Sequence, residues 1–112
     1  MTISPKKDRY ARARGAAQLV DLTCAQCHAY ILLYQKDGVG TLKRLYLDRI
    51  LAPEPLAEWR GLAEFTAIPN LVCPGCASLI GSPMVYRAEN RRAIRLQAGS
   101  FHKARHIAPK QL

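Results

Sequence analysis

The chain has 112 residues, of which 49% are hydrophobic and only 7% are aromatic. This length suits a single domain with a modest core, which a bound metal ion would help to stabilise. No apolar run approaches the roughly 20 residues of a membrane span, and none follows the basic N-terminus as a signal peptide would. We therefore expect a cytoplasmic protein with no membrane partner.

The positive charge is concentrated at the two ends of the chain. There are 17 Lys and Arg against 8 Asp and Glu, a formal net charge of +9. Residues 1–20 contain five basic residues and one acidic residue, and residues 84–112 contain seven and one. The stretch 21–83 is nearly neutral, with five basic and six acidic residues. The two ends repel each other unless solvent or a polyanion lies nearby.

The first predicted elements precede the first cysteine pair. Ser4-Pro5 suits a helix start, with Ser as the cap and Pro at the first position. The alternative is a disordered arm, which we favour for residues 1–8. Residues 19–23 (Leu-Val-Asp-Leu-Thr) are typical of a short strand that leads into Cys24.

A β-hairpin is the next predicted element. The β-branched and aromatic runs 30–35 and 41–47 flank Asp37-Gly38, and two such runs around an Asp-Gly turn are a hairpin signal. The segment 53–55 (Pro-Glu-Pro) then interrupts the chain, and residues 56–60 suit a short helical turn.

The last third of the chain predicts further β-structure. Residues 68–72 form an extended segment before the second cysteine pair, and the run after that pair is expected to end at Ser82-Pro83. Residues 84–87 and 92–96 predict a second hairpin, whose turn contains Asn90, a residue that tolerates positive φ. We expect a last strand or turn from Phe101 onward.

Four cysteines are arranged as two CxxC pairs. Cys24 and Cys27 form the first pair, and Cys73 and Cys76 the second, with 45 residues between them. Each such turn can aim two thiolates at one ion, so two turns complete a tetrahedral four-sulfur shell. This predicts one structural Zn²⁺, whose binding contributes folding free energy. A closed four-sulfur shell leaves no position for water or substrate, which disfavours zinc catalysis.

Three other interpretations of the cysteines remain. Cys24-Ala-Gln-Cys27-His28 matches the CxxCH haem-attachment motif, but haem attachment requires export and leaves the second pair unexplained. An iron centre of the rubredoxin type uses the same ligands as zinc, although a basic chain with a 45-residue gap does not favour an electron carrier. Either pair could also be a redox dithiol, but a shared metal is the simpler account of both.

The fold class predicted from these features is mainly β: a small zinc-stabilised domain with two β-hairpins, two zinc knuckles and one short helical segment. We divide the chain into a basic N-terminal arm (1–18), which is partly disordered or a short helix, a zinc-binding β domain (19–101) and a basic C-terminal tail (102–112).

The knuckles, each followed by a predicted hairpin, resemble those of the zinc-ribbon class. Their spacing is also similar to that of the β-tent fold of Yippee-like domains and methionine-R-sulfoxide reductases, and residues 73–81 (CPGCASLIG) resemble the second knuckle of that fold. The resemblance covers the knuckles and little else. The last strands lack the cysteine that serves as nucleophile in the reductases, so the resemblance implies the metal ligands and not the activity.

Basic residues of the second hairpin and of the tail are the predicted nucleic-acid contacts, and we expect the basic N-terminal arm to extend this patch. The predicted contacts are Arg87, Arg91, Arg92, Arg95, Lys103 and Arg105. Arg matches phosphate through its planar fork, and Tyr86 and Phe101 could stack on bases. We predict a non-enzymatic protein that binds RNA or DNA, with RNA or the ribosome favoured because no helix suits a major groove.

Two other functions remain open. The first is an adaptor whose sheet edges or arms dock an acidic protein. The second is a β-tent-type enzyme, for which neither a nucleophile nor a carboxylate pair is apparent, so no small-molecule substrate is expected. Two smaller features have ordinary explanations: Trp59 is expected in the core beside Leu56, and His102 and His106 in a solvated tail.

Overall fold

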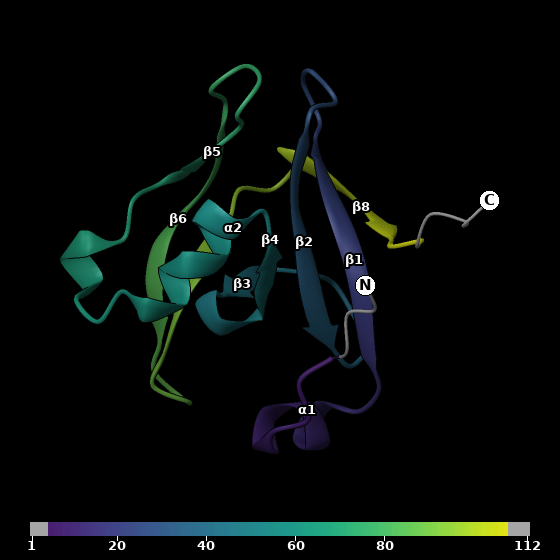
Figure 1. The fold of residues 1–112 in the computed structure, drawn as a ribbon, viewed down its shortest axis with the longest axis vertical. Coiled ribbons are helices and arrows are strands. Elements are labelled where there is room, and N and C mark those ends of the chain that lie inside the picture. Colours follow the sequence, from purple (N-terminus) through teal and green to yellow (C-terminus); the bar gives the residue numbers. More distant parts are fainter. Residues whose placement is uncertain (1–4, 108–112) are drawn as a thin grey trace.

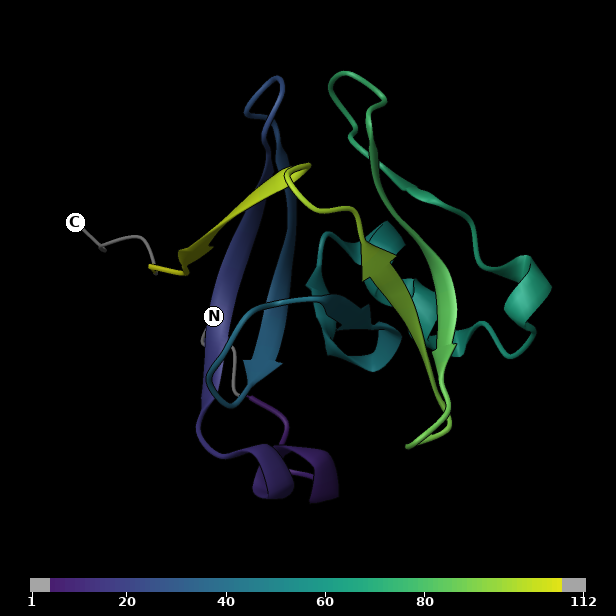
Figure 2. The same ribbon diagram turned by 180° about the vertical axis from the view of Figure 1, so that it is seen from behind.

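The computed structural model describes residues 5–107 and folds them into two four-stranded antiparallel sheets (Figures 1 and 2). The first sheet has the order β4–β2–β1–β8, and the second has the order β3–β7–β6–β5. The strands are β1 (Ala17–Cys24), β2 (Tyr30–Asp37), β3 (Arg44–Tyr46), β4 (Ile50–Ala52), β5 (Leu71–Val72), β6 (Leu79–Tyr86), β7 (Arg91–Leu96) and β8 (Phe101–Arg105). The mainly β fold predicted from the sequence is confirmed.

Helical structure in the described part of the chain is confined to short segments. They are α1 (Arg9–Arg14), α2 (Glu54–Ala57) and the 3₁₀ turns η1 (Leu47–Arg49), η2 (Glu58–Gly61) and η3 (Phe65–Ala67). The helical turn predicted at 56–60 is confirmed within α2 and η2, and Leu56 and Trp59 pack against the core as expected. None of these helices is long and apolar enough to cross a membrane.

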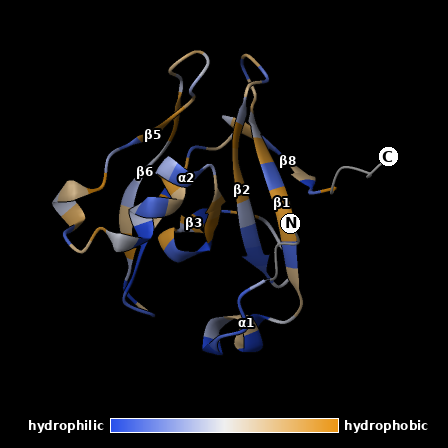
Figure 3. Cartoon of the chain, viewed as in Figure 1, coloured by the Kyte–Doolittle hydropathy of each residue, from blue (hydrophilic) through white to orange (hydrophobic). Residues whose placement is uncertain are grey.

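The core lies between the two sheets. Leu22 and Leu32 of the first sheet and Leu45, Ile80 and Ile94 of the second have no exposed surface. β1 alternates buried and partly exposed residues along its second half, as a strand with one face on a core must, and Figure 3 shows the same alternation as hydrophobic and hydrophilic bands. The apolar faces of both sheets therefore share one interior.

The second predicted hairpin is confirmed. β6 and β7 pair from Gly81↔Leu96 to Tyr86↔Arg91, and Asn90 in the turn has φ of 50°. The predicted end of the preceding run at Ser82-Pro83 is wrong, because β6 continues through both residues. Pro83 is tolerated there because it lies beyond the short strand β5, which pairs only with the start of β6, so its missing N–H breaks no ladder.

The first predicted hairpin is wrong. β2 pairs with β1 and β4, whereas β3 pairs with β7 in the other sheet. The first knuckle is itself the turn that joins β1 to β2, so the run after it already has a partner. The Asp-Gly-Val-Gly segment is instead the start of a crossover, loop 38–43, in which Gly38 and Gly40 have positive φ and Leu42 is buried.

The N-terminal segment packs on the body of the protein. Of the predicted helix start, Ser4 lies outside the described residues; the helix begins at Arg9 and is capped by Asp8, whose carboxylate accepts from the N–H groups of Tyr10 and Ala11. The Cβ of any residue replacing Gly38 would lie 2.3 Å from the Arg14 carbonyl oxygen, so glycine permits this contact with the loop. At the other end of the chain, residues 101–105 form the edge strand β8.

A buried arginine connects several of these elements. Arg49 has no exposed surface and forms ion pairs with Asp8, Asp37 and Asp48. Asp48 also pairs with Arg91 of β7 at 2.8 Å. This network of charges links the end of β2 in the first sheet to the start of β7 in the second.

Candidate metal centre and basic face

The four cysteines come together at one end of the molecule, where the β1–β2 and β5–β6 turns approach each other (Figure 1). All four Sγ atoms lie within 4.8 Å of one another. Cys24 and Cys76 are separated by 3.7 Å between sulfurs, and Cys27 and Cys73 by 3.5 Å. Metal–sulfur bonds of about 2.3 Å in a tetrahedron place sulfurs about 3.8 Å apart, so this cluster could hold one metal ion.

The two knuckles share one backbone design. In the first, the Cys24 N–H donates to the Ala29 carbonyl, the His28 N–H donates to the Cys24 carbonyl, and the Gln26 N–H points at the Cys24 sulfur at 3.3 Å. His28 has φ of 66°, which lets the chain reverse immediately after Cys27. The first cysteine is buried and the second is exposed.

The second knuckle repeats each of these bonds 49 residues later. The Cys73 N–H donates to Ser78, the Ala77 N–H donates to Cys73, and the Gly75 N–H points at the Cys73 sulfur at 3.3 Å. Ala77 has φ of 63°. The CxxC spacing therefore dictates the local turn in both halves, and the tertiary fold only has to bring the turns face to face.

Gly75 allows the two knuckles to touch. A Cβ at this position would lie 2.9 Å from the Cβ of Ala29 and 3.1 Å from the Cys27 sulfur. These separations are shorter than ordinary van der Waals contact. Glycine in the second knuckle is thus required by the approach of the first.

The electrostatics of the cluster call for a cation. The Cys27 N–H, followed by that of Gln26, lowers the pKa of the Cys24 thiol to about 6 despite burial. The Ala29 N–H favours the thiolate of Cys27, but the neighbouring thiols, Cys73 first, raise the pKa of Cys27 to about 12. Four sulfurs at these separations cannot all be thiolates without a positive charge between them.

The structure places the predicted nucleic-acid contacts in two different environments. Arg91 is buried: its guanidinium lies 3.9 Å from the Tyr10 ring centre and 3.7 Å from that of Tyr46, and it pairs with Asp48 and Glu89. It therefore packs inside the fold. The other five are exposed: Arg87, Arg92, Arg95, Lys103 and Arg105.

Two further cations lie beside this exposed set, and the first of them, Arg44, is half-buried. Arg44 of β3 is the direct cross-strand partner of Arg95, so both side chains project from the same face of the second sheet. Lys43 precedes Arg44 and is exposed. Sequence reasoning placed residues 41–47 in a hairpin with residues 30–35, so the β3–β7 pairing that brings Arg44 to Arg95 carried no local signal.

Loop 38–43, which joins β2 to β3, also lies against β8. Leu42 and the neighbouring backbone line a shallow hollow together with Phe101 and Lys103. Lys103 is the cross-strand partner of Leu22 in β1, so both side chains project from the same face of the first sheet. Figure 2 shows the loop, β7 and β8 on one side of the molecule. Of the predicted stacking side chains, Tyr86 lies 4.2 Å below the Arg44 guanidinium and Phe101 packs against the core.

Comparison with protein-family models, with curated proteins and with solved structures finds no match for this chain. The fold and the site by themselves define the class of protein: a small, mainly β domain with four cysteines placed so that they could hold one metal ion. The resemblance to zinc ribbons and β-tent proteins stays a prediction.

Proposed function

We propose that this chain is a non-enzymatic protein in which one structural Zn²⁺ clamps two β-sheets, and that the clamped domain binds nucleic acid through basic residues of β3, β7 and β8. A set of four cysteine sulfurs favours Zn²⁺ or iron over harder ions. Zinc is the better candidate because its ligand sphere is closed and no electron partner is required.

The distribution of unpaired charge carries the nucleic-acid proposal. Ion pairs among residues 5–107 draw on Asp8, Asp21, Asp37, Asp48 and Glu89. The carboxylates outside these pairs are confined to residues 54–64, and α2 and η2 in this stretch lie on the side shown in Figure 1.

The opposite side has an excess of cations. Arg44, Arg95 and Lys103 form no ion pair with any described carboxylate and come from β3, β7 and β8. We name these three residues the basic face. A surface of unpaired Arg and Lys is what a phosphate backbone recognises.

RNA or single-stranded nucleic acid suits this face better than a DNA duplex. The two α-helices of the described residues have six and four residues, which is too short for recognition in a major groove. The Arg44–Tyr86 stack offers a planar surface at the edge of the face, as single-strand binders use. A ribosomal RNA site would meet the same requirements.

Charge-matched variants test the proposal. We expect a labelled single-stranded RNA to bind the full chain with an affinity that falls steeply between low and moderate salt, with a slope of about −0.7 per phosphate contacted. Arg95→Gln with Lys103→Gln should weaken binding and reduce the slope. Arg12→Gln with Arg60→Gln removes the same charge elsewhere and should change binding far less.

Two results would oppose the proposal. If RNA does not bind at low salt, the function is wrong. If both double variants lose affinity equally, the binding reflects net charge alone and not the basic face.

An acidic protein partner is the second candidate, because β8 is an edge strand whose residues 102–105 are exposed. An extended acidic peptide could add to this edge by backbone pairing. Co-purification of one acidic protein after nuclease treatment would favour this adaptor function over the nucleic-acid function.

A further inference from the structure

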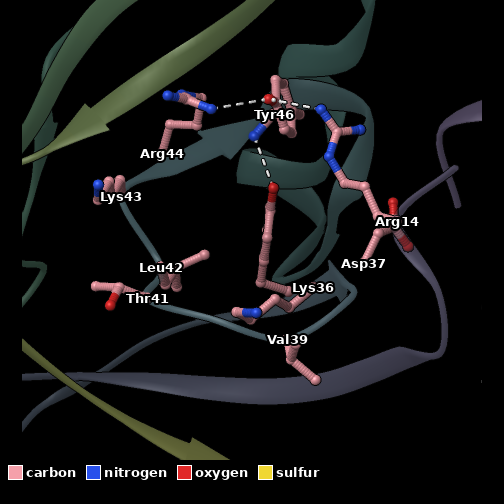
Figure 4. A pocket seen from close by; sticks show the side chains of 10 residues that line it. Arg14, Lys36, Asp37, Val39, Thr41, Leu42, Lys43, Arg44 and Tyr46 are labelled. Atoms are coloured by element: carbon pink, nitrogen blue, oxygen red, sulfur yellow. Dashed lines mark hydrogen bonds between the residues drawn. The ribbon is translucent and has the colours of Figure 1, made fainter.

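A second basic site lies beside the basic face and is built differently. Loop 38–43, the end of β2 and β3 enclose a cavity of about 310 Å³ (Figure 4). Its lining includes one carboxylate, Asp37, and four cations, Arg14, Lys36, Lys43 and Arg44. Of the four cations, Arg14 pairs with Glu89 at 2.6 Å. The volume is at the lower end of the range for small-ligand pockets.

Lys36 is the unusual member of this lining. Its side chain is only 6% exposed, and its ammonium donates one hydrogen bond, to the Gly38 carbonyl at 2.9 Å. No carboxylate of residues 5–107 forms an ion pair with it. Burial, and next the charge of Lys103, lower the pKa of Lys36. A buried ammonium with spare donors and no counter-ion is costly unless an anion joins it.

The one carboxylate of the lining is already neutralised. Asp37 accepts from the Arg49 Nε at 2.9 Å and from the Gln35 amide at 2.8 Å, and its side chain is 4% exposed. It therefore offers little compensation to the cations across the cavity, which keeps the site positive.

Tyr46 provides a neutral donor among these cations. Its hydroxyl oxygen accepts hydrogen bonds from Arg14 and from Arg44, each at 3.2 Å, and Figure 4 shows the two guanidinium groups on either side of it. Among the described hydrogen bonds the hydroxyl proton has no acceptor, so it is available to a ligand. Arg44 likewise has N–H groups to spare.

We propose that this cavity binds a phosphate monoester, held by Lys36, Lys43, Arg44 and the Tyr46 hydroxyl. A phosphate monoester has about two negative charges and three terminal oxygens, which suit a cavity with Lys36 on one side and Arg44 with the Tyr46 hydroxyl on the other (Figure 4). A carboxylate has one charge and two oxygens and would satisfy fewer of these donors. The volume leaves room for part of the esterified group as well as the phosphate.

The phosphate has two possible sources with the same chemistry. It is either the phosphate of a small metabolite or the terminal phosphate of a nucleic-acid strand that lies on the basic face. The cavity shares Arg44 with the basic face, but Lys36 and Tyr46 belong to the cavity alone, so variants of these two residues test the site without the nucleic-acid proposal.

Calorimetric titration of the full, metal-loaded chain tests the pocket. The probes are inorganic phosphate, 5′-AMP and adenosine in a phosphate-free buffer. We expect phosphate and 5′-AMP to bind and adenosine not to bind. Lys36→Met and Tyr46→Phe should each weaken 5′-AMP by about tenfold or more, since hydrogen bonds to charged groups are strong. Arg87→Gln, an exposed arginine outside the cavity, should leave the affinity unchanged.

Separate controls test whether the variants fold and where the phosphate comes from. Lys36→Met should keep or raise the melting temperature, because it removes a buried charge, so lost binding cannot be assigned to unfolding. If an excess of single-stranded RNA with a 5′-phosphate competes with 5′-AMP, the phosphate is assigned to the end of a nucleic-acid strand. If that RNA does not compete, the phosphate is assigned to a free ester, and either result supports the pocket. The Arg95→Gln, Lys103→Gln variant should lose RNA and retain 5′-AMP.

The proposal is overturned if neither phosphate nor 5′-AMP binds. It is also overturned if both cavity variants bind 5′-AMP as the wild type does. Either result leaves the RNA assay on the basic face intact, so the two proposals fail separately.

Discussion

At one end of the molecule four sulfurs from the β1–β2 and β5–β6 turns lie within 4.8 Å of one another. Where β2 ends and β7 begins, Arg49 and Arg91 share Asp48, and Arg49 also pairs with Asp37. We refer to the first as the sulfur clamp and to the second as the ionic clamp. Both connect the first sheet to the second.

The two clamps differ in how they respond to conditions. In the proposed function the sulfur clamp holds one Zn²⁺ by four ligands, so removing the ion or a ligand should disrupt it as a unit. The ionic clamp consists of several pairs with different exposure: Asp37 is buried, whereas the side chains of Asp8 and Asp48 are about two-fifths exposed. Its members should therefore contribute unequally and depend on pH.

Loss of the metal should have the largest effect. Structural Zn²⁺ contributes on the order of 10 kcal/mol in small domains, which is comparable with the whole stability of a domain. We expect Cys73→Ser, or chelation of the wild type, to abolish cooperative thermal unfolding, and elemental analysis of the wild type to find one zinc per chain.

A substitution inside the same knuckle provides the control. Gln26→Ala keeps the backbone N–H that faces the Cys24 sulfur and should retain both metal and melting temperature. A metal-free chain that melts at the wild-type temperature would contradict the sulfur clamp.

Breaking the ionic clamp should have the second largest effect. Arg49→Met leaves Asp37 buried without its cation, which typically costs about 3–5 kcal/mol, measured by urea unfolding. Replacing both partners, as in Arg49→Met with Asp37→Leu, should recover much of that loss. Arg92→Met, at an exposed position of β7, should stay close to wild type. Equal stability of the two arginine variants would show that the ionic clamp is unimportant.

Contact between the knuckles can be weakened without touching a ligand. Gly75→Ala introduces a Cβ 2.9 Å from that of Ala29, and overpacking of this kind costs about 1–3 kcal/mol. Gly61→Ala, where nothing lies within 4 Å of the added Cβ, is the matched control. Ala29→Gly should rescue Gly75→Ala if the clash is the cause, whereas failure of the rescue would place the cause elsewhere in the knuckle.

Acid should have the smallest of these effects on stability, by weakening the ion pair between Asp8 and Arg49. The hydrogen bond from Arg49 lowers the pKa of Asp8 to about 2, from about 3.9 in an unfolded chain. Its contribution to stability is therefore full above about pH 4 and is lost as the pH falls through about 2.

The difference in unfolding free energy between the wild type and Asp8→Asn, measured at each pH, isolates the contribution of the Asp8 carboxylate, because acid effects on the metal are common to both chains. Asn retains the capping oxygen. A difference that does not shrink between pH 4 and pH 2 would contradict the assignment to Asp8.

Local spacing was sufficient for the sulfur clamp and for one of the hairpins. A CxxC pair specifies its own turn through short-range N–H to sulfur and N–H to carbonyl bonds, so Cys24, Cys27, Cys73 and Cys76 were predicted together. The β6–β7 hairpin was predictable for the same reason, since Asn90 and the flanking runs are neighbours in the chain.

Pairing between distant strands was not predictable. The run 41–47 has the composition of a strand, but composition does not say whether β2 or β7 is its partner. Its pairing with β7 goes with burial of Leu42 and Leu45 in the shared core and with Gly38, which lets loop 38–43 pass beside Arg14 of α1. The same step brought Arg44 to Arg95 and enclosed Lys36.

The charged residues show most clearly which properties the sequence determines and which depend on the tertiary structure. The amino-acid order already contained the excess of cations, the four metal ligands and the mainly β composition, because these depend on residue type and short spacing. Which arginine faces solvent and which is buried between tyrosines depended on the second sheet, since Arg91 and Arg92 are adjacent in sequence and opposite in exposure. Successive side chains of a strand point to opposite faces, and only packing determines which face is covered.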